Sequence, residues 1–141
     1  MAGYDRALYQ MYLSRIPMFG SCSTEQLDLI AQLGDAISVA DAHDVVREGD
    51  AGDGFYVVTS GSATVRRGGQ EVARLAPGDY FGELSLFDPA PRNATVTAAG
   101  TLTCVTLPPA AFAQALDQVP AMRDALLHGM ARRIHEIDQR V

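Results

Sequence analysis

Between residues 36 and 107 the chain is a succession of short segments rich in Val, Thr, Phe and Tyr, separated by turns that contain glycine. β-Branched and aromatic residues favour extended backbone. Many short strands separated by turns are typical of a β-sandwich or barrel rather than of alternating β and α units. The predicted strand segments are AISVA, DVVREGD, GFYVVTSG, SATVRR, QEVARLAP, DYFGE, NATVTAAG and LTCVTLP.

The turns between these segments carry glycines, which adopt the positive φ that tight hairpins need. We expect each of these turns to connect two strands. They are Gly49-Asp50, Gly52-Asp53-Gly54, Ser60-Gly61, Gly68-Gly69 and Pro77-Gly78-Asp79.

Helical periodicity precedes the β region in two stretches. Pro17 ends the first helix, which begins at about Asp5, and the capping-box pair Ser23 and Gln26 starts the second. The apolar positions at helical spacing, which we expect to be buried, are Leu8, Met11, Tyr12 and Ile16 in the first helix and Leu27, Ile30 and Leu33 in the second.

Helical periodicity returns after the β region. Pro108-Pro109 is a favourable helix opening, because the first N–H groups of a helix have no partner there, and Pro120 opens a further helix. The apolar positions are Phe112 and Leu116 in the first helix and Met122, Leu126, Met130 and Ile137 in the last. Arg133 falls on the last stripe, where an arginine ordinarily extends to water.

Composition excludes several classes of protein. The 141 residues suit one globular domain, and the net charge of −6 argues against a nucleic-acid surface, which would need a basic face. Cys22 and Cys104 are too few for a disulfide framework, and we expect free thiols in a reducing compartment. His43, His128 and His135 are far apart in sequence. Only His128 and His135 could share a helix face, where we expect solvated side chains rather than metal ligands. Without a signal-peptide pattern or an apolar run of membrane length, we expect a cytoplasmic protein without membrane insertion.

The segment FGELSLFDPAPRNATVT, residues 81–97, is mostly apolar but carries Glu83 at the start of a predicted helical turn and Arg92 at the start of a strand. Gly82 allows close approach to the backbone, and the first N–H groups of the turn are unpartnered. The planar arginine fork donates two parallel hydrogen bonds to a phosphate, whereas a carboxylate accepts from sugar hydroxyls. Together these groups suit a nucleotide. A direct Glu83–Arg92 ion pair is the alternative, and the spacing leaves both interpretations open.

The same segment resembles the phosphate-binding cassette of the cyclic nucleotide-binding domain family. In that cassette F-G-E, an aliphatic, a small and another aliphatic residue precede a short loop and P-R-x-A-T or P-R-x-A-S. The upstream REGDAGDGFYVVTSGSATV and VARLAPGDYFGE and the flanking helices also fit, from about Leu8 to Ile137. The resemblance implies a single domain over residues 1–141. Its N-terminal helices would span about 5–34, an eight-stranded antiparallel, jelly-roll-like β-roll about 36–107, and C-terminal helices about 109–139.

The resemblance also implies roles for individual residues. Arg92 would pair with the exocyclic oxygens of a cyclic phosphate, and Glu83 would accept the ribose 2′-hydroxyl. The other implied contacts are backbone N–H groups near Gly82, Leu84, Ser85, Asn93 and Ala94, the base-facing Val65, Val72 and Ala73, and Arg133 in the last helix, which acts as a lid.

Base selectivity depends on the residue after the cassette arginine. That residue is often Ala in cyclic AMP binders and Thr in cyclic GMP binders of the family, whereas here it is Asn93. Its amide can accept from guanine or bond to phosphate or backbone. The implied ligand is cyclic AMP, with cyclic GMP as the alternative.

The expected function is regulatory and not enzymatic. Ser85 has no histidine nearby in sequence, and the acidic residues are scattered on turns. We predict a sensor without a cofactor that couples ligand binding to movement of the C-terminal helix and acts on an effector protein or a fused effector domain. A β-roll that has lost its ligand and serves as a protein-interaction scaffold is the alternative, against which the intact Glu83 and Arg92 argue.

Two further classes are disfavoured. A metal-binding β-barrel enzyme of the cupin type would need clustered His and Glu residues on its strands, and the sequence has no such cluster. A transcription factor would need a DNA-reading module, and we find none in this chain, so direct DNA binding is not expected.

Overall fold

The computed structural model describes residues 5–52, 54–87 and 90–138, with the side chains of all of these but 133 and 135–138. The chain forms two compact units. The β unit spans Gly34–Pro109, and the helical unit combines residues 5–33 with residues 110–138. The prediction of a single domain over residues 1–141 stays a prediction.

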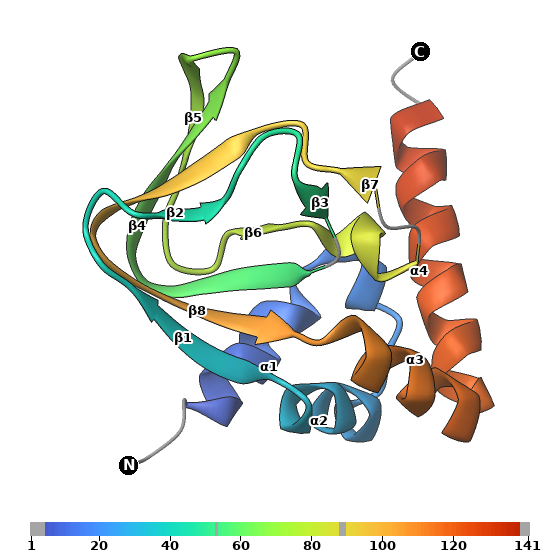
Figure 1. Cartoon of the computed structure of the whole chain (residues 1–141). Helices are drawn as coiled ribbons and strands as arrows, with labels where there is room; N and C mark the ends of the chain where they lie inside the picture. Colours follow the sequence, from blue (N-terminus) through green and yellow to red (C-terminus); the bar gives the residue numbers. More distant parts are fainter. Residues whose placement is uncertain (1–4, 53, 88–89, 139–141) are drawn as a thin grey trace. The chain divides into compact units, whose positions relative to one another are not determined.

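The β unit contains eight strands among its described residues, and every paired strand is antiparallel. One sheet has the order β1-β8-β4-β5, with β2 also paired to β8 and β6 to β4, and the second sheet pairs β3 with β7 (Figure 1). This confirms the predicted mainly antiparallel β-roll. The strands are β1 (Asp35–Val39), β2 (Asp44–Val46), β3 (Ala51–Gly52), β4 (Phe55–Arg67), β5 (Gln70–Leu75), β6 (Tyr80–Phe81), β7 (Ala90–Pro91) and β8 (Thr95–Leu107).

The predicted turn at Ser60-Gly61 is wrong, because β4 continues through it as a strand of 13 residues. Gly61 adopts φ +81°, and the β4–β8 register shifts between Ser60 and Ser62, so the glycine forms a bulge rather than a reversal. A Cβ at Gly61 would collide with the carbonyl oxygen of Thr101 on β8. Pairing with β8 on both sides of the bulge overrides the local turn signal.

Other predicted turns are confirmed. Gly68 and Gly69 have φ of +59° and +81° and join β4 to β5 in a two-residue hairpin, with Arg67 paired to Gln70 (Figure 1, green). Gly78 also adopts a positive φ, of +95°. Gly68 and Gly69 therefore set the reversal between β4 and β5.

Side chains from the two longest strands, β4 and β8, form most of the core of the β unit. It contains fully buried side chains from β4 and β8, and its central cluster is Val58, Ala63, Val96, Ala98, Leu102 and Cys104. Cys104 and Cys22 are both free thiols, as predicted, and burial raises the pKa of each to about 11. Neither thiol is therefore appreciably ionised near neutral pH.

The helical unit contains α1 (Arg6–Ser14), the 3₁₀ turn η1 (Pro17–Phe19), α2 (Thr24–Gln32), α3, which begins at the unit boundary (Pro109–Gln118), and α4 (Pro120–Asp138). The predicted capping box is confirmed: Ser23 Oγ accepts from Gln26 N, and Gln26 Oε1 accepts from Ser23 N. Phe112, Leu116, Met122 and Leu126 are buried, as their spacing predicted. The side chain of Ile137 lies outside the described residues.

The predicted buried stripe of α1 is partly wrong. Tyr9 and Leu13 are fully buried together with Ile16, whereas Met11 is 40% exposed. Residues 9, 13 and 16 also recur at helical spacing. The sequence of this short helix therefore contains two apolar stripes, and periodicity alone does not show which one is buried. Packing within the helical unit selects the stripe that contains Tyr9.

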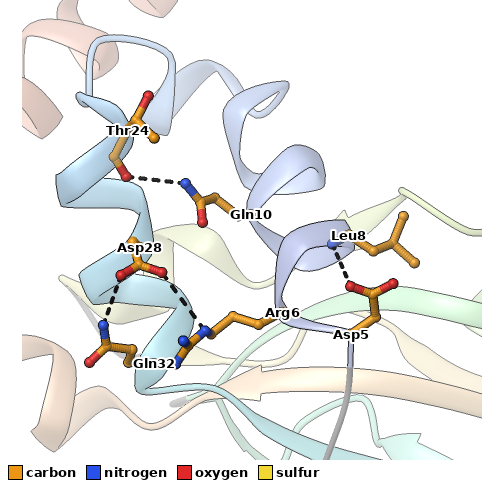
Figure 2. A network of polar contacts seen from close by, with 7 residues as sticks. All are labelled: Asp5, Arg6, Leu8, Gln10, Thr24, Asp28 and Gln32. Atoms are coloured by element: carbon orange, nitrogen blue, oxygen red, sulfur yellow. Dashed lines mark hydrogen bonds and ion pairs between the residues drawn. The ribbon is translucent and has the colours of Figure 1, made fainter.

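Polar contacts join α1 to α2 on their exposed sides (Figure 2). Asp28 accepts from Gln32 Nε2 at 2.9 Å and lies 3.8 Å from Arg6 Nε, while Gln10 Nε2 donates to the carbonyl oxygen of Thr24 at 3.1 Å. Exposed pairs of this kind contribute about 0–1 kcal/mol each, so the buried side chains supply most of the stability. None of the described helices is long and apolar enough to cross a membrane.

Candidate functional site

A cavity of about 310 Å³ lies in the β unit. The 3₁₀ turn η2 (Glu83–Leu86) forms one wall, and the chain from β7 into the start of β8 forms another. The third wall is mostly apolar. Its lining residues are Phe81, Gly82, Glu83, Leu84 and Ser85 on the η2 side, Ala90, Pro91, Arg92, Asn93 and Ala94 on the β7–β8 side, and Val46, Val65, Arg67, Leu75 and Val96 between them.

Arg92 is the half-buried cation of the cavity. Its Nη2 donates to the carbonyl oxygen of Gly54 at 2.6 Å, and its guanidinium carbon lies 5.9 Å from the centre of the Tyr56 ring. Its Nε is buried and has no hydrogen-bond partner among the described residues. A buried donor without an acceptor is costly, so a ligand that supplied an acceptor to this N–H would relieve that cost.

The backbone around Arg92 is held by the neighbouring loop. Arg92 N donates to the carbonyl oxygen of Asp50 at 2.8 Å, and Gly49 N donates to the carbonyl oxygen of Arg92 at 2.8 Å. These bonds extend the β3–β7 pairing, in which Gly52 lies opposite Ala90. The position of the arginine is therefore set by main-chain pairing rather than by its own side chain alone.

Two glycines leave room for the guanidinium. A Cβ added at Gly52 would lie 2.9 Å from Arg92 Nε, and one added at Gly82 would meet Arg92 Nη1 and the carbonyl oxygen of Gly54. Gly82 also has φ +82°, a left-handed conformation that other residues rarely adopt. Any larger residue at Gly82 would displace either η2 or the arginine.

Ser85 fastens η2 to the same carbonyl group. It is buried, and its hydroxyl lies 2.6 Å from the carbonyl oxygen of Gly82 and 3.1 Å from that of Gly54. Gly54 O thus accepts from both Ser85 and Arg92. The turn η2 and the Arg92 side chain thus share one acceptor, which links the two walls of the cavity that they form.

Glu83 lines the cavity in a half-buried position. The ion pairs among the described residues include neither Glu83 nor Arg92, so the direct pairing considered from the sequence is not formed. The carboxylate and the guanidinium are each left with capacity for another group. Both charged residues line one cavity, and their assignment to a ligand stays a prediction.

The other predicted site residues divide into three groups. Gly82, Leu84, Ser85, Asn93, Ala94 and Val65 line the cavity with Glu83 and Arg92. Val72 and Ala73 lie on β5 and do not line it, and Val72 is 51% exposed. Ala73 pairs with Val65 across the β4–β5 ladder. Their assignment as base contacts stays a prediction. The side chain of Arg133, in α4, lies outside the described residues.

Sequence reasoning missed Arg67, which lines the cavity and donates from Nε to the carbonyl oxygen of Asn93 at 3.1 Å. The signal was present: Arg67 follows Val65 by two positions, and side chains two apart on a strand share a face. Val46, Leu75 and Val96 were also missed. Among the described residues, no group of three His, Cys, Asp or Glu side chains comes close enough to hold a metal ion.

Comparison with known proteins gives a consistent result. A family model described as "Cyclic nucleotide-binding domain" matches residues 37–119. The chain is 39% identical over 118 residues to a cAMP-dependent protein kinase regulatory subunit from Mucor circinelloides f. lusitanicus, covering 81% of this chain and 28% of the relative. It is 35% identical over 116 residues to a protein of the same name from Blastocladiella emersonii, covering 79% and 29%. The chain thus spans less than a third of the length of these curated relatives.

Two solved structures have a fold similar to that of this chain. The N-terminal domain of a transcriptional regulator from Streptomyces coelicolor A3(2) superposes with a TM-score of 0.84 at 34% identity, covering 91% of this chain and 95% of that one. The regulatory domain of Toxoplasma gondii PKA with cAMP superposes with a TM-score of 0.71 at 26% identity, covering 93% of this chain and 50% of that one.

Proposed function

The chain belongs to the cyclic nucleotide-binding domain family, and on that premise we propose that it binds a cyclic nucleotide, principally cyclic AMP, in the cavity of the β unit. The observation that carries this proposal is Arg92, which lines the cavity, is held by Gly54 O and keeps a buried Nε without a hydrogen-bond partner among the described residues. A cavity of about 310 Å³ is within the size range of small-molecule sites.

The residues of the cavity suit the parts of the ligand. Arg92 would donate to the exocyclic oxygens of the cyclic phosphate, because a guanidinium matches phosphate geometry. Glu83, which has no cationic partner among the described residues, would accept the ribose 2′-hydroxyl. The apolar wall around Val65 and Leu75 would receive the base.

Cyclic AMP is favoured as the principal ligand by the relatives. The two curated proteins described above are named as cAMP-dependent, and the Toxoplasma structure contains cAMP. The same relatives support a regulatory, non-catalytic role. We infer that ligand binding changes the conformation of α4 and that the signal passes to an effector, either a separate protein or a fused domain.

Thermal shift with cyclic AMP, cyclic GMP and linear AMP tests the binding function. A ligand that binds only the folded state raises the melting temperature by mass action, so the cyclic nucleotides should stabilise the protein and linear AMP should not. If neither cyclic AMP nor cyclic GMP raised the melting temperature, the proposal would be contradicted and the scaffold alternative favoured.

Calorimetric titration of Arg92→Ala tests the site. Hydrogen bonds to charged groups contribute about 1.5–3 kcal/mol, so affinity for cyclic AMP should fall about tenfold to a few hundredfold. Arg66→Ala is the matched control, since Arg66 is a neighbouring exposed arginine that does not line the cavity. Undiminished affinity in folded Arg92→Ala would reject this site.

A further inference from the structure

The helical unit has a cavity of its own, of about 210 Å³, between the end of α1 and the middle of α4. Organic ligands typically occupy sites of about 300–1,000 Å³, so this smaller volume suits an ion rather than a nucleotide. The lining residues are Ser14, Arg15, Ile16, Pro17 and Gly20 on the α1–η1 side and Gly129 and Arg132 on α4.

Two of these lining residues are arginines, and none is acidic. Arg15 and Arg132 take part in none of the ion pairs among the described residues. Other arginines of the same helices are paired: Arg6 lies beside Asp28 (Figure 2), and Arg123 pairs with an aspartate. In a chain with a net charge of −6, this cavity therefore has a local excess of positive charge.

Both guanidinium groups keep donors for a ligand. Arg15 Nη2 lies 3.9 Å from Met11 Sδ, and a thioether sulfur is only a weak acceptor. The Arg132 side chain has no hydrogen-bond partner in the described part of the chain. A planar guanidinium can donate two parallel hydrogen bonds to an oxyanion, so the cavity offers two such groups from different helices.

Backbone packing brings the two arginines to the same cavity. Gly129 is buried, and a Cβ there would meet the carbonyl oxygens of Met18 and Pro17, so α4 and η1 are in close backbone contact. Arg132 follows Gly129 by three positions and therefore lies on the same side of α4. Arg15 comes two residues before Pro17. The contact that needs Gly129 thus also sets the approach of Arg132 to Arg15.

The dipole of α1 opposes an anion at this place, because the helix ends at the cavity with its carboxyl end. That end is equivalent to about half a negative elementary charge. Its last carbonyl groups are already engaged: Tyr12 O accepts from Arg15 N at 3.1 Å, and Leu13 O accepts from Ile16 N at 3.0 Å. Two arginines carry two full positive charges, so attraction of an anion exceeds the effect of the dipole.

We propose that Arg15 and Arg132 bind a small tetrahedral oxyanion, such as inorganic phosphate, between the end of α1 and α4. The bound ion accepts hydrogen bonds from both guanidinium groups and joins the N-terminal and C-terminal parts of the helical unit. Because both arginines are exposed, the affinity is weak, in the millimolar range. This site is separate from the cavity of the β unit and does not depend on cyclic nucleotide binding.

Thermal shift with inorganic phosphate tests this site. The whole chain is used with Arg92→Ala, which removes the anion donor of the β unit, and phosphate replaces chloride at constant ionic strength. The melting temperature should rise and saturate, as expected for a ligand that binds only the folded state. Arg15→Gln and Arg132→Gln should each weaken the apparent phosphate affinity about threefold to tenfold, and the double variant should lose the saturable shift.

Arg66→Gln is the control, because Arg66 is exposed and does not line this cavity, so its removal should leave the phosphate affinity unchanged. Melting temperatures in chloride establish that each variant is folded. Phosphate also stabilises proteins by exclusion from their surface. A shift that does not saturate and is equal in all variants would be that general effect and would overturn the inference. If only one of the two arginines mattered, the ion would not join α1 to α4, and the inference would also fail.

Discussion

At the scale of single residues, the candidate site depends on how one carbonyl group is shared. Gly54 O accepts from Arg92 Nη2 and from Ser85 Oγ, and Gly82 leaves the space through which the guanidinium reaches it. These two hydrogen bonds, with the space at Gly82, connect the residue that carries the charge to the turn that forms the opposite wall. Substitutions at the glycines are therefore expected to act on the arginine.

We expect Gly82→Ala to lower both stability and cyclic AMP affinity. At φ +82° an alanine is strained by about 1–2 kcal/mol, and its Cβ would also meet Arg92 Nη1 and Gly54 O. Gly100→Ala is the matched control, because Gly100 has φ +76° but open space around it. Denaturant unfolding should show a larger loss for Gly82→Ala, and titration should show an affinity loss for that variant alone. Equal behaviour of the two variants would contradict the packing argument.

Glu83→Ala should weaken cyclic AMP binding less than Arg92→Ala does, by about tenfold, because one hydrogen bond to a hydroxyl is lost. A 2′-deoxy analogue lacks that hydroxyl, so its affinity should be nearly the same in the variant and the wild type. Glu71→Ala is the control, since Glu71 pairs with Arg74 and does not line the cavity. If Glu83→Ala lowered the affinities for cyclic AMP and for the 2′-deoxy analogue equally, Glu83 would not be the acceptor of the ribose 2′-hydroxyl.

The sequence predicted the site's charged pair but not its full lining. Glu83, Arg92 and their glycine lie within one short segment, so spacing alone brought them together. Arg67 could have been inferred from its spacing to Val65 on one strand, whereas Val46 comes from a distant strand and its place depends on the β2–β8 register, which no local pattern specifies. Val72 and Ala73 lie outside the lining although Leu75 of the same strand belongs to it, and the β4–β5 register shifts beside Ala73, so strand alternation alone does not predict which β5 residues reach the cavity.

At the scale of the elements, a glycine can change the structure that the local sequence favours. Gly61 allows β4 to continue through a turn signal as a bulge, which sequence spacing could not distinguish from a hairpin. The face of α1 could not be predicted for a similar reason: two apolar stripes fit the period, and packing decides between them. By contrast, the capping box of α2 was predictable because its bonds lie within four residues.

Gly129 in α4 gives a prediction at this scale. In an isolated helix Gly→Ala is favourable by about 1 kcal/mol. Gly129 is buried, however, and a Cβ there would meet the carbonyl oxygens of Met18 and Pro17 at η1. Gly129→Ala should therefore destabilise the protein by about 1–3 kcal/mol in denaturant unfolding, through overpacking between α4 and η1.

Ala131→Gly controls for helix propensity, because Ala131 is exposed on the same helix. It should cost about 0.5–1 kcal/mol. If Gly129→Ala stabilised the protein instead, propensity would outweigh the contact with η1, and the close approach of the two elements would not be needed for folding.

At the scale of the whole molecule, the β unit carries the cavity while α4 belongs to the helical unit. A ligand shifts a conformational equilibrium only by the difference between its affinities for the two states. We therefore expect cyclic AMP, but not linear AMP, to change hydrogen exchange in residues 120–138. Exchange in α4 that is identical with and without saturating cyclic AMP would contradict coupling between the two units.

The hydrogen bond between Arg92 and Gly54 O means that the Arg92 side chain loses its rotamer entropy when the protein folds, not when a ligand binds. An arginine side chain that becomes ordered gives up about 2 kcal/mol of rotamer entropy. Here the hydrogen bond to Gly54 O and the neighbouring glycines order the guanidinium as part of folding. An arriving anion therefore meets a donor that is already oriented, and its affinity depends on the rigidity of the β3–β7 pairing that holds the Arg92 backbone. Substitutions that weaken this pairing should therefore lower the affinity without touching the ligand.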